Sequence, residues 1–174
     1  WGEILSSYGY VVLSVGYYGM WNDFGIPCVY PAPVSAIKTG VEFIRKNSLQ
    51  FGCYSGKVAS ISISGGSIHS AQTIIWDNDD TFFGTDPNIN DHLDASVLFY
   101  GLYDYYNHLE SVLPLDDWLS GYFSPNPLLR STKGNPFTNI NNITTPILMF
   151  HGTADQVTNF VQSEEFRDSL AAHG

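Results

Sequence analysis

Residues 57–75, KVASISISGGSIHSAQTII, decide the fold of this chain. In residues 57–63, small polar and branched apolar side chains alternate, which predicts a strand. The turn Ser-Gly-Gly-Ser follows at residues 64–67, and apolar residues then return at helical spacing over residues 68–75. We therefore expect a strand, a tight glycine turn and a helix in direct succession.

On either side of this unit, segments with the apolar pattern of a strand alternate with segments with the apolar pattern of a helix. Short β-branched and apolar runs predict buried strands, and an apolar stripe at three- to four-residue spacing predicts a helix. Alternating strands and helices imply an α/β fold with a mostly parallel sheet and helices on both faces, in which ligands bind at the carboxyl ends of the strands. The predicted strands are residues 9–15, 94–100 and 146–150, and the predicted helices are residues 34–47 and 161–172.

The length and composition of the chain favour one compact unit. It has 174 residues, of which 44% are hydrophobic, enough for one core. We expect residues 1–174 to form a single, partial domain. Residues 103–143 have little periodicity and are expected to be a cap-like insertion over the carboxyl edge of the sheet. We expect most of the aromatic side chains in this insertion to pack in the core, and the alternative is that they line an acyl or sugar pocket. These aromatic residues are Trp118, Tyr122 and Phe123.

The charge balance excludes several classes of partner. Lys and Arg number 7 against 17 acidic residues, giving a net charge of -10, which would repel nucleic acids and anionic membranes. No apolar stretch is long enough for a membrane span. Cys28 and Cys53 lack zinc-site spacing and could pair with each other. The stretch Asp77-Asn78-Asp79-Asp80 alternates like a calcium loop, but the glycine and glutamate that such a loop needs further along are missing. We therefore expect a solvated loop there, and neither a metal nor a cofactor.

Ser64 lies at the corner between the predicted strand and helix, where a hydroxyl is exposed and the helix directs amide hydrogens outward. This corner resembles the nucleophile elbow, Gly-x-Ser-x-Gly, of the α/β-hydrolase family, particularly its esterase and lipase branch. The resemblance implies that Ser64 is the nucleophile and that the Gly65 amide forms half of the oxyanion hole. Ser62 departs from the motif, because it stands where the family has glycine. A second register makes Ser67 the alternative nucleophile and puts the bulkier His69 at the closing glycine.

A second motif follows the last predicted strand. Residues 145–157, TPILMFHGTADQV, resemble the late strand of the same family, in which the aspartate of His-Gly-x-x-Asp is the acid of the catalytic triad. The resemblance assigns this acid to Asp155, where a carboxylate could orient the catalytic imidazole. The alternative is that Asp155 only caps the helix that follows it.

The resemblance also implies that two parts of the site lie outside this chain. The second oxyanion donor normally comes from a His-Gly-Gly loop, expected before Trp1, and the catalytic histidine normally follows the acid by about thirty residues. None of the histidines present fits the role of base. His151 is expected to be structural, His69 lies on the elbow helix, and His92, His108 and His173 are expected at the surface.

The function implied is hydrolysis of a small carboxylic ester by a Ser-Asp-His triad, including acetyl esters of carbohydrates. On this hypothesis the chain alone has little turnover. Two alternatives stay open. One is a noncatalytic hydrolase-fold binding protein, favoured by Ser62 and the absent histidine. The other is a serine peptidase of the prolyl-oligopeptidase type, against which Gly65 argues because that family carries a bulky residue there.

Overall fold

The computed structural model describes residues 1–17, 30–54, 56–76, 85–104 and 134–174. Its described residues contain a three-stranded sheet with the strand order β1-β2-β3, formed by β1 (Ala59–Ile63), β2 (Ala95–Phe99) and β3 (Ile147–Phe150). Both pairs of neighbouring strands are parallel. The carboxyl ends of the three strands therefore meet at one edge of the sheet, as the sequence predicts.

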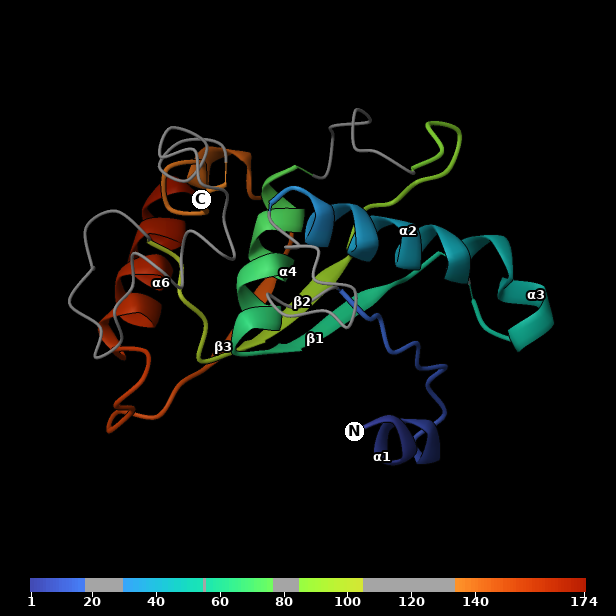
Figure 1. The fold of residues 1–174 in the computed structure, drawn as a ribbon, viewed down its shortest axis with the longest axis horizontal. Coiled ribbons are helices and arrows are strands. Elements are labelled where there is room, and N and C mark those ends of the chain that lie inside the picture. Colours follow the sequence, from blue (N-terminus) through green and yellow to red (C-terminus); the bar gives the residue numbers. More distant parts are fainter. Residues whose placement is uncertain (18–29, 55, 77–84, 105–133) are drawn as a thin grey trace, which may run out of the picture.

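The helices connect these strands in the order expected of a parallel sheet. The long helices α2, α4 and α6 lie on one side of the sheet, whereas α1 lies on the other (Figure 1). The bounds are α1 (Gly2–Ser7), α2 (Ala32–Lys46), α3 (Ser48–Phe51), α4 (Gly65–Ile75), the 3-10 helix η2 (Ile140–Asn142) and α6 (Val161–His173). Each long helix begins within three residues of an expected start or, for α4, directly at the predicted turn.

Two apolar clusters form the core on the covered side of the sheet. One joins α4, β2, η2 and α6, and the ring of Tyr103 stacks on that of Phe166 in it, with ring centres 4.4 Å apart. The other lies under α2, where Ile37 and Val41 pack against Ile74 of α4. Ala71 and Ile74 belong to these clusters and hold the C-terminal half of α4 on the sheet.

The opposite side of the sheet carries an apolar row that the described residues leave partly open. Ile61 and Leu148 lie in register with Val97 between them and are 42% and 55% exposed. Trp1 approaches this face, with its ring 6.1 Å from that of Phe99. Among the described residues, no helix has the length and apolar character needed to cross a membrane.

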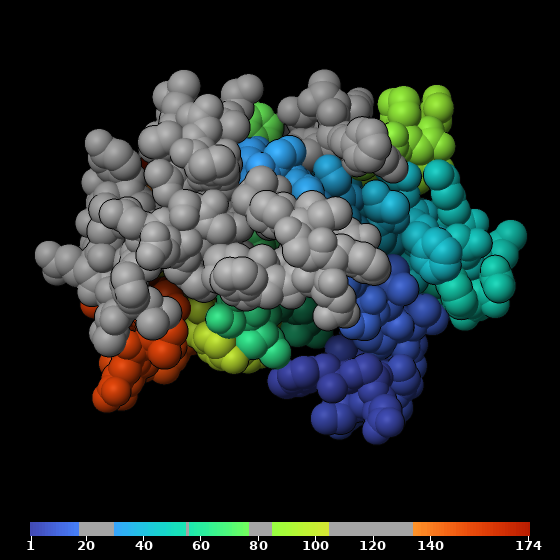
Figure 2. Space-filling model, viewed as in Figure 1, coloured from blue at the N-terminus to red at the C-terminus, as the bar shows by residue number. Residues whose placement is uncertain are grey.

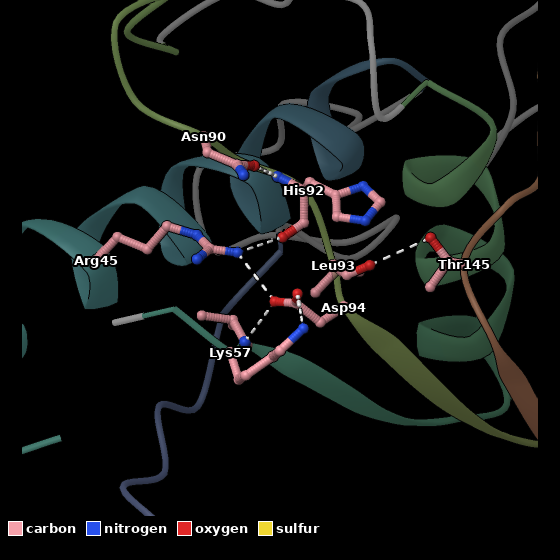
Figure 3. Close-up of polar contacts among 8 residues, drawn as sticks. Arg45, Lys57, Asn90, His92, Leu93, Asp94 and Thr145 are labelled. Atoms are coloured by element: carbon pink, nitrogen blue, oxygen red, sulfur yellow. Dashed lines mark hydrogen bonds and ion pairs between the residues drawn. The ribbon is translucent and has the colours of Figure 1, made fainter. Parts of the chain in front are cut away.

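An ion cluster closes the amino ends of β1 and β2 (Figure 3). The Asp94 carboxylate accepts hydrogen bonds from Arg45 at 3.1 Å, Lys57 at 3.2 Å and the Val58 amide at 2.8 Å. The Arg45 guanidinium also donates to the His92 carbonyl at 2.8 Å. The cluster ties α2 to both strands at the end of the sheet away from the predicted site.

The predicted strand at residues 9–15 is wrong. Residues 10–17 pair with no strand of the described part of the chain, and Tyr10 and Val11 are 66% and 42% exposed. The segment projects with α1 at the lower edge of the molecule, in dark blue in Figure 2. Only its end packs inward, where Val15 lies against the cluster under α2. An apolar run becomes a strand only where a neighbouring strand satisfies its amides and carbonyls, and the described residues place no such strand beside this segment.

Several predictions fall outside the described residues. They are the loop at residues 77–80, the pairing of Cys28 with Cys53, His108 and most of the cap-like insertion at residues 103–143, including Trp118, Tyr122 and Phe123.

Candidate active site

Ser64 occupies the corner between β1 and α4 in a backbone conformation that is unfavourable for a side chain. It precedes the helix with φ 52° and ψ -120° and is exposed to solvent. Its amide donates to the Phe99 carbonyl of β2 at 3.0 Å, and its carbonyl accepts from the Ser67 amide at 2.9 Å. A non-glycine residue held at positive φ costs about 1–3 kcal/mol and persists only where the surroundings enforce it. The fold therefore presents this hydroxyl outward at a cost in stability.

The neighbours of Ser64 show how the irregular motif is accommodated. The hydroxyl of Ser62, which stands at the family's glycine position, bonds to that of Ser70 at 2.5 Å, so it points into the structure under α4. A methyl group added at Gly66 would meet the Tyr17 hydroxyl at 3.5 Å, an ordinary contact distance. Gly65 is the first residue of α4, where backbone amides have no acceptor within the helix. Its N–H is thus available to an external oxygen.

Ser67, the alternative nucleophile, is fully buried. Its hydroxyl lies 2.7 Å from the Ser62 carbonyl and 2.9 Å from the Phe99 carbonyl, either of which can accept its proton, and its oxygen accepts from the Phe99 amide at 3.1 Å. These bonds join the first turn of α4 to the ends of β1 and β2. The arrangement favours a structural role for Ser67 and leaves Ser64 as the exposed hydroxyl.

Asp155 lies in the loop between β3 and α6. Its Oδ1 accepts from the Val157 amide at 2.8 Å and the Thr158 amide at 3.0 Å. Its Oδ2 lies 3.4 Å from Nε2 of His151. The alternative that Asp155 caps the helix is wrong, because α6 begins at Val161 and its N-cap is Phe160. The carboxylate instead organises its own loop.

These contacts keep the Asp155 carboxyl ionised. Burial alone would raise its pKa, but the hydrogen bonds from the amides of Val157 and Thr158, with a smaller contribution from the contact with His151, outweigh burial and hold the pKa below the ordinary value of 3.8. A carboxylate that stays ionised near neutral pH can stabilise an imidazolium.

The sheet brings Ser64 and Asp155 to the same edge. The Ser64 amide bonds to the last residue of β2, and the Tyr100 amide just beyond β2 bonds to the Phe150 carbonyl of β3 at 2.8 Å. One strand therefore lies between β1, which precedes Ser64, and β3, which precedes the loop of Asp155, so the two strands are about 10 Å apart at the usual strand spacing.

None of the described histidines fits the role of base. His69 is buried within α4 and bonds to Gln72, and its burial lowers the pKa to about 4 although the Gln72 bond partly opposes the change. His173 bonds to the Ser169 carbonyl at the exposed end of α6. His92 lies at the opposite end of the sheet, where its carbonyl accepts from Arg45. His151 touches Asp155, but its Nε2 has the Thr158 carbonyl of the loop as a partner and its Nδ1 has the Ser163 hydroxyl of α6.

No cluster of three or more His, Cys, Asp or Glu side chains suited to a metal ion occurs in the part of the chain that the structure describes. The site as described consists of a serine, a carboxylate and a helix N-terminus. These are groups that serve acyl transfer without an added cofactor.

A strained serine at a strand-to-helix corner and an aspartate beyond a later parallel strand define the α/β-hydrolase fold class. The comparisons with known proteins narrow the class. The family model described as BD-FAE matches residues 2–170, and the chain belongs to this family of carbohydrate esterases. No curated relative matches the chain.

Solved structures share the fold. A truncated carbohydrate esterase from gut microbiota aligns with a TM-score of 0.61 and 18% identity over 84% of this chain and 57% of its own. A bifunctional GH43-CE protein of Bacteroides eggerthii aligns with a TM-score of 0.69 and 22% identity, over 84% of this chain and 21% of its own. The propionate-bound esterase Est2 of Thermogutta terrifontis aligns with a TM-score of 0.63 and 22% identity, over 81% of this chain and 50% of its own. The chain thus spans little more than half of these proteins at most.

Proposed function

We propose that this chain is the part of a serine esterase that carries the nucleophile and the acid of its triad. Ser64 is the nucleophile, Asp155 is the acid, and the Gly65 amide is one oxyanion donor. The catalytic histidine and the second oxyanion donor come from outside the chain. The observation that carries this proposal is the exposed Ser64 hydroxyl at positive φ, next to the free N-terminus of α4.

In the proposed reaction the Ser64 hydroxyl attacks the ester carbonyl carbon while the histidine removes its proton. The carbonyl oxygen becomes an oxyanion beside the Gly65 amide, and Asp155 stabilises the imidazolium. The imidazolium then protonates the leaving alcohol as the ester bond breaks and an acyl-serine forms. Water, activated by the same histidine, hydrolyses the acyl-serine and restores the hydroxyl.

Short acyl esters of carbohydrates are the proposed substrate class. Membership of a carbohydrate esterase family supports it, as do the propionate- and butyrate-bound forms of the similar Thermogutta esterase. The acidic net charge of -10 is compatible with a neutral sugar ester and unfavourable for an anionic one.

The test is hydrolysis of p-nitrophenyl acetate by the intact protein that carries this chain. Ser64→Ala should abolish turnover, whereas Ser67→Ala should keep most of it and lose stability, because Ser67 bonds the ends of β1 and β2. Loss of turnover only in Ser67→Ala would assign the nucleophile to the other register.

Two further results would replace the proposal. Cleavage of a proline p-nitroanilide with no ester turnover would favour the peptidase alternative. Full-length protein that neither hydrolyses any ester nor depends on Ser64 would favour the noncatalytic binding protein.

A further inference from the structure

His151 lies at the base of the loop that carries Asp155, and its side chain is only 1% exposed. Its Nε2 is 2.9 Å from the Thr158 carbonyl and 3.4 Å from Asp155 Oδ2. Its Nδ1 is 2.7 Å from the Ser163 hydroxyl at the start of α6. The ring of Phe160 packs edge-on against the imidazole of His151, with the two ring centres 5.8 Å apart. The imidazole is therefore held from several sides by the loop and by α6.

The partners of His151 determine which nitrogen carries the proton. A carbonyl and a carboxylate can only accept, so Nε2 must be protonated to bond to Thr158 or to face Asp155. In the neutral ring Nδ1 is then the acceptor, and the Ser163 hydroxyl donates to it. The Thr158 carbonyl thus determines the tautomer, and the Ser163 hydroxyl is compatible with it because a hydroxyl can donate.

Thr158 is held on both of its backbone groups. Its amide donates to Asp155 Oδ1 at 3.0 Å, and its carbonyl accepts from His151 Nε2 at 2.9 Å. Thr158 therefore links the His151 ring to the Asp155 carboxylate through two hydrogen bonds, and the direct contact of His151 with Asp155 Oδ2 at 3.4 Å lies beside them. Oδ1 accepts from the amides of Val157 and Thr158, so Oδ2, which faces His151 Nε2 at 3.4 Å, is the oxygen that an incoming imidazole would use.

We infer that His151 is a positioning residue for the acid, and that it acts by donating from Nε2 to the loop that holds Asp155. The inference rests on the proposed function, because it assumes that Asp155 orients the catalytic histidine. His151 itself does not touch the substrate. Its effect on turnover comes from keeping Oδ2 aligned, since a misplacement of about 1 Å at a catalytic group can cost about 100-fold in rate.

Two amide substitutions separate the two ring nitrogens. Glutamine places an N–H donor near the position of Nε2, whereas asparagine reaches only the position of Nδ1. His151→Gln should keep the bond to Thr158 and keep kcat within about 5-fold, whereas His151→Asn should lower kcat about 10- to 100-fold. KM should change less than about 2-fold in both, because substrate contacts are intact. His173→Asn, at the exposed end of α6, is the matched control and should leave kcat unchanged.

Two outcomes would overturn the positioning role. One is wild-type kcat in His151→Asn, and the other is an equal loss in the glutamine and asparagine variants. Turnover that survives Ser64→Ala would instead contradict the proposed function. If Ser64→Ala is inactive and His151→Asn is fully active, only the positioning role fails.

A measurement on the unmutated protein covers the case in which the asparagine variant does not fold. Nitrogen-15 NMR of the histidine rings reports the tautomer directly. A proton on Nε2 of His151 that exchanges slowly with water is the expected result. A ring protonated only on Nδ1 could not donate to Thr158 and would overturn the inference.

Discussion

The two ends of the parallel sheet differ in how their charged and polar groups are paired. At the amino ends, Asp94 has two cations and an amide as partners (Figure 3). At the carboxyl ends, Ser64 is exposed in a costly conformation and Asp155 keeps one oxygen outside its loop's amide bonds. The comparison indicates that the charged groups at one end stabilise the sheet, whereas the other end holds the groups proposed to be catalytic. Substitutions at the two ends should therefore separate stability from activity.

The largest effect is expected on rate, at the carboxyl end. Asp155→Asn keeps an oxygen for the Val157 and Thr158 amides but loses the charge that stabilises an imidazolium, so kcat should fall about 10³- to 10⁴-fold. Steady-state kinetics on the intact protein, with a denaturation curve as control, would check it. A loss of less than about 10-fold would show that another group is the acid.

The next largest effect is expected on stability, beneath α2. Lys38 and Asp91 form an ion pair at 2.9 Å with side chains 0% and 7% exposed. Removing one partner of a buried pair typically costs about 3–5 kcal/mol, so Asp91→Asn should lower the free energy of unfolding by roughly that amount. Urea denaturation measures this change. A stability equal to wild type would mean that water already screens the pair.

A smaller loss of stability is expected at the amino end. Asp94→Ala removes the acceptor of the Val58 amide and an ion partner of Arg45 and Lys57, which should cost about 2 kcal/mol. Because this cluster lies at the end of the sheet away from Ser64, kcat of the folded protein should stay within about 2-fold. A large fall in kcat of a folded Asp94→Ala protein would show that the amino end of the sheet also affects activity.

The lowered pKa of Asp94 predicts how the free energy of unfolding changes with pH. Burial would raise the pKa of Asp94, but the Val58 amide and the Lys57 and Arg45 cations hold it below the ordinary value of 3.8. The stability it contributes is present above 3.8 and is lost as pH falls through the lower folded pKa. Asp94→Asn should therefore flatten the fall in unfolding free energy below pH 3.8. An unchanged slope would show that other carboxyls, such as Asp155, dominate it.

The smallest effect tests the strain at the elbow. Ser64→Gly and Ser64→Ala both remove the hydroxyl, but only glycine relieves the positive φ. The glycine variant should be more stable than the alanine variant by about 1 kcal/mol after the gain in unfolded-chain entropy is subtracted. Thermal denaturation of the pair measures it. Equal stabilities would mean that the turn is not strained.

Much of this fold could be predicted from the sequence because its periodicity was clear. The strand expected at residues 57–63 is observed at Ala59–Ile63, and the helix expected at residues 161–172 is observed at Val161–His173. The strand expected at residues 9–15 failed, because apolar content does not reveal whether a pairing partner exists. The short helices α1 and α3 were missed, since one or two turns leave little periodic signal.

The candidate site was predictable only in part for a related reason. Ser64 and Asp155 follow strands and carry family motifs, so their placement at one edge followed from the strand order. The contact of His151 with Asp155 and Thr158 could not be foreseen, although the four-residue spacing of His151 and Asp155 was visible. The path of a loop decides such contacts, and the sequence of a loop constrains its path weakly.

The central claim is that Ser64 is the nucleophile, and locating a covalent adduct tests it most directly. The intact protein would be treated with a fluorophosphonate, digested, and its peptides sequenced by mass spectrometry. A phosphonyl group on Ser64, absent after denaturation before treatment, is the predicted result. An adduct on Ser67, or no adduct in a folded protein that hydrolyses esters, would contradict the account.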